Sequence, residues 1–269
     1  MQAELKKAVD YINERISIKP EAALILGSGL GDFADTFDAS IKIPTSEIPG
    51  YPRSTVEGHK GFLVFGEHKG VPLMAVQGRT HYYEGYDIQR VSFVVEIIAA
   101  LGIPYLLVTN AAGSVNPRFK PGDLMLISDH VNFLFDSPLR GSARFTDMSN
   151  PYSSELVHDI EQMALNKGIA LKRGVLWVSS GPTYESAAEV GMIRKMGGDA
   201  ASMSTVPEVI MANTLGLKTV GISCLTNYAT GISKEKLTHE EVTITAKKVK
   251  ETFISLVSNI VTEIFTAPA

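Results

Sequence analysis

The stretch that decides the fold is AALILGSGLG, residues 22–31. Its first half, residues 22–26, is a short uncharged apolar run, which is typical of a strand buried on both faces of a sheet. The run ends in Gly27-Ser28-Gly29, where small residues leave backbone N–H groups and one hydroxyl accessible to a phosphate. Asp32 stands at the third glycine of the dinucleotide-binding pattern, and the Walker lysine is missing. The stretch therefore predicts a buried strand and a tight turn, either with or without a bound anion.

Helices and strands alternate on both sides of this turn. Apolar periodicity predicts helices at residues 2–16, 88–101, 153–167 and 186–196, from Thr205, and from Thr238 onward, and strands at 105–109, 124–128, 175–179 and 220–225. The runs 62–65 and 71–76 flank His68-Lys69-Gly70, which predicts a hairpin and an antiparallel pair. No linker breaks the alternation, so we expect one α/β domain over residues 1–269, with a central mixed β-sheet flanked by helices.

Composition limits the classes of partner. The 269 residues include 25 Lys+Arg and 29 Asp+Glu, a formal net charge of −4, which argues against a general nucleic-acid binder but allows a small anionic ligand. The single cysteine, Cys224, excludes an intrachain disulfide and a cysteine zinc site. No signal peptide, membrane span or metal-ligand spacing is recognisable. We expect a cytoplasmic protein that binds no membrane and no metal.

Polar motifs follow several of the predicted strands, where α/β sheets collect ligand contacts. In QGRTHYYEGY, residues 77–86, Arg79 and His81 project to the same side of an extended segment, so both can reach one anion. Ser204 precedes a predicted helix start, which is either an anion site or an ordinary cap. Taken singly, residues 108–113 also fit a close-packed turn, Glu185 a solvated carboxylate and His239 an ordinary histidine near a helix cap. Asn227 ends a predicted strand and offers a hydrogen-bond donor and an acceptor together.

Taken together and in order, these segments resemble the trimeric purine nucleoside phosphorylases. The matching segments cover nearly the whole chain: residues 24–31, 54–66, 77–86, 108–113, 122–133, 181–190, 203–213 and 237–242. The resemblance implies reversible phosphorolysis of purine ribo- and deoxyribonucleosides in nucleoside salvage, giving free base and pentose 1-phosphate. It also implies a homotrimer in which inorganic phosphate is a co-substrate and no cofactor is needed.

The resemblance also implies roles for individual residues. The phosphate pocket comprises Ser28, His59, Arg79, His81, the backbone N–H of Ala111, and Ser204. The ribose contacts are Tyr83, Met203 and His239, and the base contacts are Tyr184, Glu185 and Asn227. His81, Glu185 and Asn227 are the implied catalytic residues, and Phe145 is the aromatic that a neighbouring subunit receives. The chain departs from the family pattern at Tyr184, at Ala201-Ser202 and in the short stretch 137–148.

The base contacts predict a substrate preference. Glu185 can accept from a ring N–H, and Asn227 can donate where the departing purine gathers negative charge. A 6-oxopurine carries that N–H, whereas adenine presents an acceptor, so inosine and guanosine are expected over adenosine. Two alternatives stay open, a 5′-methylthioadenosine phosphorylase and a catalytically silent purine-binding protein. Asparagine at position 227, where the former family typically has aspartate, weighs against the first alternative.

Overall fold

The decisive stretch forms the strand β1 (Ala22–Leu26), and every side chain of that strand is buried. β1 pairs in parallel with β4 (Val71–Gln77) on one side and β5 (Tyr105–Ser114) on the other. The computed structural model describes residues 2–56, 60–233 and 239–266, and for residues 239–243 it describes the backbone only. Within that part of the chain, β1 lies in the middle of the core.

The strands form one nine-stranded mixed sheet in the order β2-β3-β4-β1-β5-β8-β7-β6-β9. Its other strands are β2 (Asp38–Pro44), β3 (Phe62–His68), β6 (Leu124–Asn132), β7 (Leu171–Val178), β8 (Ala200–Ser202) and β9 (Lys218–Tyr228). β3 and β4 are antiparallel, as the predicted hairpin requires. β9 also pairs in parallel with β5, so the second half of the sheet closes on itself.

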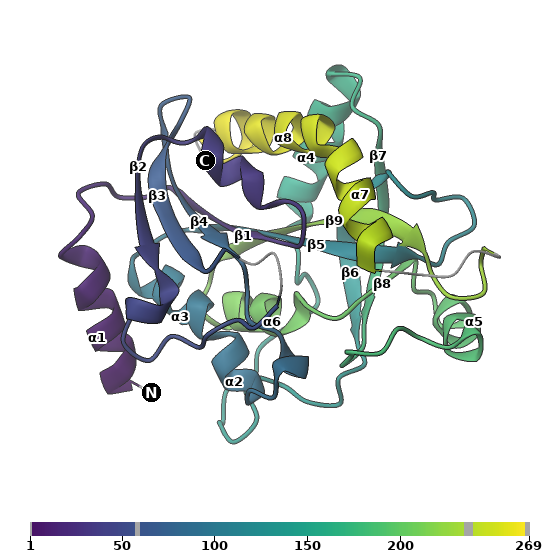
Figure 1. Ribbon diagram of the computed structural model, residues 1–269, viewed down its shortest axis with the longest axis horizontal. Helices are drawn as coiled ribbons and strands as arrows, with labels where there is room; N and C mark the ends of the chain where they lie inside the picture. The colour runs from purple at the N-terminus through teal and green to yellow at the C-terminus, as the bar shows by residue number, and fades with distance from the viewer. Residues whose placement is uncertain (1, 57–59, 234–238, 267–269) are drawn as a thin grey trace.

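Helices cover the sheet from two sides (Figure 1). On one side lie α1 (Gln2–Asn13), α2 (Ile88–Val91), α3 (Phe93–Ala100) and α6 (Val206–Thr214), and on the other α4 (Ser154–Asn166), α7 (His239–Lys248) and α8 (Lys250–Asn259). α5 (Ala187–Lys195) stands apart from both groups. Short helical turns complete the chain: η1 (Gly31–Thr36), η2 (Thr45–Glu47), η3 (Tyr82–Glu84) and the π-helical η4 (Ile260–Ile264). The result is the expected mixed α/β fold.

Helix α7 covers the turn that follows β1. Gly29 in that turn has φ +75°, a conformation that suits glycine. A Cβ at Gly29 would lie 2.5 Å from the Cβ of Ala246, which is fully buried. The turn and the helix are therefore in direct contact, with no room for a side chain between them.

Some elements differ from those predicted. The predicted helix 88–101 is interrupted at Ser92 and the last helix at Val249, because both residues have ψ close to 0° and leave the helical region. The predicted helix cap at Thr238 lies outside the described residues. β2 was missed because only Ile43 of this strand is buried, and β8 because it has three residues. No helix among the described residues is both long enough and apolar enough to cross a bilayer.

Candidate active site

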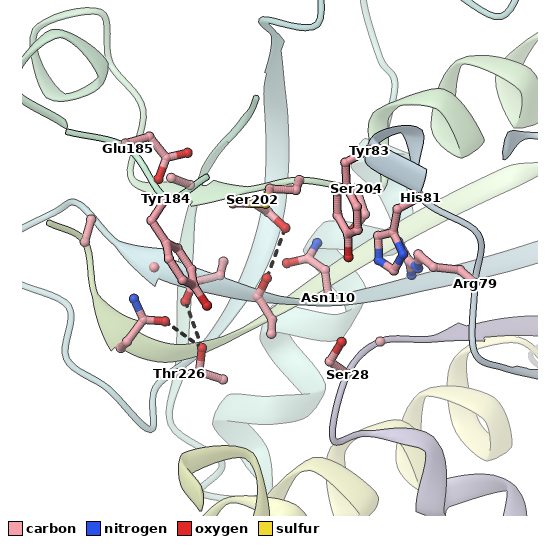
Figure 2. Close-up of a pocket in the computed structure, with 18 residues that line it drawn as sticks. Ser28, Arg79, His81, Tyr83, Asn110, Tyr184, Glu185, Ser202, Ser204 and Thr226 are labelled. Carbon is pink, nitrogen blue, oxygen red and sulfur yellow. Dashed lines mark hydrogen bonds between the residues drawn. The ribbon is translucent and has the colours of Figure 1, made fainter. Parts of the chain in front are cut away.

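The carboxyl ends of β1, β4, β5 and β9 meet the start of α6 around a cavity of about 110 Å³. Its lining comprises Gly27, Ser28, Arg79, His81, Tyr83, Asn110, Ala111, Ala112, Gly113, Tyr184, Glu185, Ala201, Ser202, Met203, Ser204, Thr226, Asn227 and Ala229. Figure 2 shows Ser28, Arg79 and His81 gathered at one end, with Tyr184 and Glu185 at the other. The two ends differ in chemistry and are described separately below.

A buried cation marks the first end. The guanidinium of Arg79 is 2% exposed and donates to Thr205 Oγ1 at 3.0 Å and to the carbonyls of Ile25, at 3.4 Å, and Thr109. It also lies 3.3 Å from the carboxylate of Glu208. Burial lowers the pKa of Arg79, and the negative charge of Glu208 opposes that shift. Arg79 is thus held from several directions in the wall of the cavity.

His81 is held by a carboxylate of its own. Its backbone N–H donates to Glu84 Oε1 at 2.7 Å, and its ring Nδ1 lies 3.2 Å from the same oxygen. Glu84 Oε2 accepts from the backbone N–H of Thr55 and, at 2.9 Å, from its hydroxyl. Burial raises the pKa of Glu84, but these hydrogen bonds outweigh it and hold the pKa at about 2. The ionised carboxylate orients the imidazole, which stacks on Tyr83 with ring centres 4.7 Å apart.

The turn before α6 adds a hydroxyl to this end. Ser204 lines the cavity, and the next residue, Thr205, has φ +89° although it is β-branched. Thr205 N donates to Glu208 Oε2 at 3.1 Å, and Asn110 Nδ2 donates to Thr205 Oγ1 at 2.9 Å. These bonds fix the position from which Ser204 faces the cavity.

The second end is less enclosed. Tyr184 is 41% exposed. Burial raises the pKa of Glu185, and one of its carboxylate oxygens is buried without a hydrogen-bond partner among the described residues. Asn227 Oδ1 accepts from Thr226 Oγ1 at 2.9 Å, and its Nδ2 donates to the carbonyl of Tyr228 at 3.0 Å. This end offers a flat aromatic face, a carboxyl group and an amide.

The predicted site residues can now be placed. Those that line the cavity are Ser28, Arg79, His81, Tyr83, Ala111, Tyr184, Glu185, Met203, Ser204 and Asn227. His59 lies outside the described residues, and His239 begins α7 but its side chain is not described. Phe145 is fully exposed in the single chain and does not line the cavity. The predicted phosphate, ribose and base contacts with described side chains are thus brought together, and Phe145 stands apart.

Several polar groups around the cavity have no role among the site residues that the resemblance implies, although Ser202 is one of the chain's departures from the family pattern. Asn110 follows Thr109 on β5, Ser202 Oγ donates to the carbonyl of Ala111 at 3.0 Å, and Glu208 supports Arg79 from behind. Asn110 belongs to a strand-end motif that pointed to the right place. The spacing Thr205-x-x-Glu208 predicts a helix cap and nothing more.

The arrangement suits two kinds of ligand group. Arg79, His81 and the hydroxyls of Ser28 and Ser204 can hold an oxyanion, because they join a fixed cation to convergent donors. Tyr184, Glu185 and Asn227 can hold a planar heterocycle by stacking and edge hydrogen bonds. Within the described residues, no group of three His, Cys, Asp or Glu side chains is arranged to hold a metal ion.

Comparison with known proteins gives consistent matches. Residues 21–262 match the model of the phosphorylase superfamily. The purine nucleoside phosphorylase 1 of Geobacillus stearothermophilus is 48% identical over 263 residues, which cover 96% of each chain. A crystal structure of a Schistosoma purine nucleoside phosphorylase with hypoxanthine has a TM-score of 0.92 at 34% identity and covers 97% of each chain. A Schistosoma mansoni structure with adenosine has the same TM-score, identity and coverage.

Proposed function

Because the chain belongs to the phosphorylase superfamily, and within it to the purine nucleoside phosphorylases, we propose that its cavity cleaves purine nucleosides with inorganic phosphate. Membership of this family makes the chain a pentosyltransferase. The reaction is reversible and yields a free purine and ribose or deoxyribose 1-phosphate. The observation that carries the proposal is that the phosphate, ribose and base contacts expected from the sequence, where their side chains are described, line one cavity.

Phosphate binds at the end that contains Arg79. It accepts hydrogen bonds from the guanidinium, from His81 and from the backbone N–H of Ala111, and the hydroxyls of Ser28 and Ser204 complete the pocket. His59 belongs to the same set by resemblance. When the glycosidic bond breaks, positive charge develops on the ribose, so the phosphate below the ring is both nucleophile and counter-charge. Arg79 and His81 thus act by placing the phosphate.

The purine binds at the opposite end. Tyr184 supports its face, Glu185 accepts from a ring N–H, and Asn227 donates to the edge where negative charge gathers as the base leaves. A donor of this kind, placed where charge develops, is worth on the order of 3–4 kcal/mol. A 6-oxopurine satisfies Glu185 and adenine does not, so inosine and guanosine react faster than adenosine. Since one similar structure holds adenosine, the preference is a ratio of rates and does not exclude adenosine from the pocket.

The remaining roles complete the proposal. Tyr83 and Met203 contact the ribose, and His239 reaches its 5′-hydroxyl. The enzyme works in the cytoplasm as a homotrimer, in which the exposed ring of Phe145 reaches the site of a neighbouring subunit. Neither a metal nor an organic cofactor takes part, because phosphate does the covalent work.

A nucleoside panel assayed with and without phosphate tests the proposal. Inosine, guanosine, xanthosine, adenosine and 5′-methylthioadenosine are compared by release of the free base. We expect phosphate-dependent release, fastest with inosine and guanosine. Release that persists without phosphate would indicate a hydrolase, and binding without release in calorimetry would indicate a silent binding protein. 5′-Methylthioadenosine as the best substrate would reassign the protein to the other phosphorylase family.

A further inference from the structure

Two helices beside the cavity begin with the same capping pattern, yet their carboxylates lie in different surroundings. At α5, the backbone N–H of Ser186 donates to Glu189 Oε2 at 2.7 Å, and Glu189 is exposed. At α6, the backbone N–H of Thr205 donates to Glu208 Oε2 at 3.1 Å, and Glu208 is 1% exposed. Capping a helix needs only the first arrangement, so the burial of Glu208 calls for another cause.

The cause lies in the second contact of Glu208. Its carboxylate is 3.3 Å from the guanidinium of Arg79, and both side chains are buried. Burying a carboxylate is unfavourable unless a charge partner compensates it, and Arg79 is that partner. Glu208 does not line the cavity, so it stands behind Arg79 rather than beside a substrate.

Thr205 links the same carboxylate to the rest of the phosphate end. Its backbone, at φ +89°, is in a region that β-branched residues rarely adopt, and such strain persists only where the surroundings enforce it. Glu208 holds the backbone N–H of Thr205, while Arg79 and Asn110 donate to its hydroxyl at 3.0 and 2.9 Å. One carboxylate therefore fixes both the turn that carries Ser204 and the guanidinium.

We propose that Glu208 is a positioning residue for the phosphate co-substrate. It aims Arg79 and the Ser204 hydroxyl at the same oxyanion without touching it. The proposal rests on the proposed function, since it assigns a support to the phosphate end of that site. A residue that only capped α6 would affect stability and leave the affinity for phosphate unchanged.

The test compares Glu208→Gln with Glu189→Gln as the matched control. The amide of E208Q still accepts from Thr205 but lacks the charge beside Arg79. We expect the KM for phosphate to rise about tenfold, as for loss of one charge-assisted contact, with the KM for inosine unchanged. E189Q should leave the KM for phosphate unchanged. A fall of kcat in E208Q at an unchanged KM for phosphate would overturn the proposal.

Phosphate binding measured by calorimetry without nucleoside separates this proposal from the proposed function. If the unmodified protein binds phosphate and E208Q binds it equally well, the positioning role is wrong and phosphorolysis stands. If the unmodified protein neither binds phosphate nor cleaves nucleosides, the proposed function fails first. If E208Q does not fold, Thr205→Val decides, because it removes the hydroxyl that ties Arg79 to the same turn. A KM for phosphate that does not rise in T205V overturns the proposal.

Discussion

The two ends of the cavity differ in how far their polar groups are already paired within the protein. At the phosphate end the charges are paired within the protein, since Arg79 faces Glu208, and Glu84 is ionised with a pKa of about 2. At the other end, where the base is proposed to bind, Tyr184 is 41% exposed, and one carboxylate oxygen of Glu185 is buried without a hydrogen-bond partner among the described residues. The first end is organised before any ligand arrives, whereas the second is completed by the ligand. On the proposed function, the first end therefore offers a preformed site for phosphate, whereas the second end both selects the purine and stabilises it as it leaves.

The largest effect is expected from Arg79→Met, which removes the buried cation of the organised end and leaves Glu208 without its charge partner. Loss of the guanidinium should lower kcat/KM for phosphate by about 10²–10³-fold, as for removal of one preorganised donor. The variant should also lose about 3–5 kcal/mol of unfolding free energy, because Glu208 is left buried without a charge partner. Urea unfolding and steady-state kinetics measure the two losses. The double variant R79M/E208Q should regain the stability but not the activity, and a regained activity would remove Arg79 from the site.

At the base end, Asn227→Asp should change the selectivity and spare the phosphate end. A carboxylate at this position accepts from a 6-amino group and repels a 6-oxo group, so the ratio of kcat/KM for adenosine over inosine should rise by about 10²-fold or more. The KM for phosphate should stay the same. Asn166→Asp, an exposed change at the end of α4, serves as the control. An unchanged ratio in N227D would contradict the placement of Asn227 on the purine edge.

Glu84→Gln tests the organised end through the pH dependence of the unfolding free energy. The folded pKa of Glu84 is about 2 against an ordinary value of 4.5, so its stabilisation is present above pH 4.5 and is lost as the pH falls towards 2. The shift corresponds to about 3 kcal/mol. E84Q should therefore be less stable than the unmodified protein by this order at pH 7, and the difference should vanish near pH 2. Urea unfolding over this range measures it, with the exposed Glu67→Gln as control. An equal deficit at pH 2 would mean that packing, not charge, is lost.

Protonation of Glu185 should have a smaller effect, on ligand binding. The pKa of Glu185 is raised, whereas that of Glu84 is lowered. Burial raises the pKa of the Glu185 carboxyl, so it becomes protonated at a higher pH than an ordinary glutamate. The protonated form accepts from the purine N–H only through its neutral carbonyl oxygen, and this hydrogen bond is weaker than one to a carboxylate. Binding of hypoxanthine, measured by calorimetry without phosphate, should weaken below that pKa by at most tenfold per pH unit. Glu185→Gln should bind weakly at every pH and remove the dependence. Binding that is independent of pH in the unmodified protein would mean that Glu185 does not meet the ring N–H.

Much of the fold follows from the sequence because its signals are local. Apolar runs such as residues 22–26 mark buried strands wherever the chain goes next, and the hairpin around His68-Lys69-Gly70 already makes the sheet mixed. β2 carries no such run, since it is an edge strand exposed along most of its length. β8 exists only because residues 200–202 meet β5 and β7, which lie far away in sequence.

The sequence predicted where the cavity lies, but not which residues hold the cavity-lining side chains in place. Strand ends with glycine, histidine and asparagine pointed to the cavity, because ligands meet α/β sheets at that edge. The identical spacing of Glu189 and Glu208 shows the limit, since one carboxylate is exposed and the other faces Arg79. What distinguishes them is the packing of α6 against β5 and β9, which brings Glu208 to Arg79, and that packing has no local pattern in the sequence.

The contact between Gly29 and Ala246 has a consequence for evolution and engineering. These two positions cannot drift independently, because a methyl group on the glycine would overlap the alanine of α7. In homologues with a larger side chain at either position, we expect α7, which begins at His239, to lie farther from the turn after β1. A mutant library meant to reshape the turn after β1 should therefore randomise Gly29 and Ala246 together. Most changes at one position alone would displace α7 from the turn that it contacts.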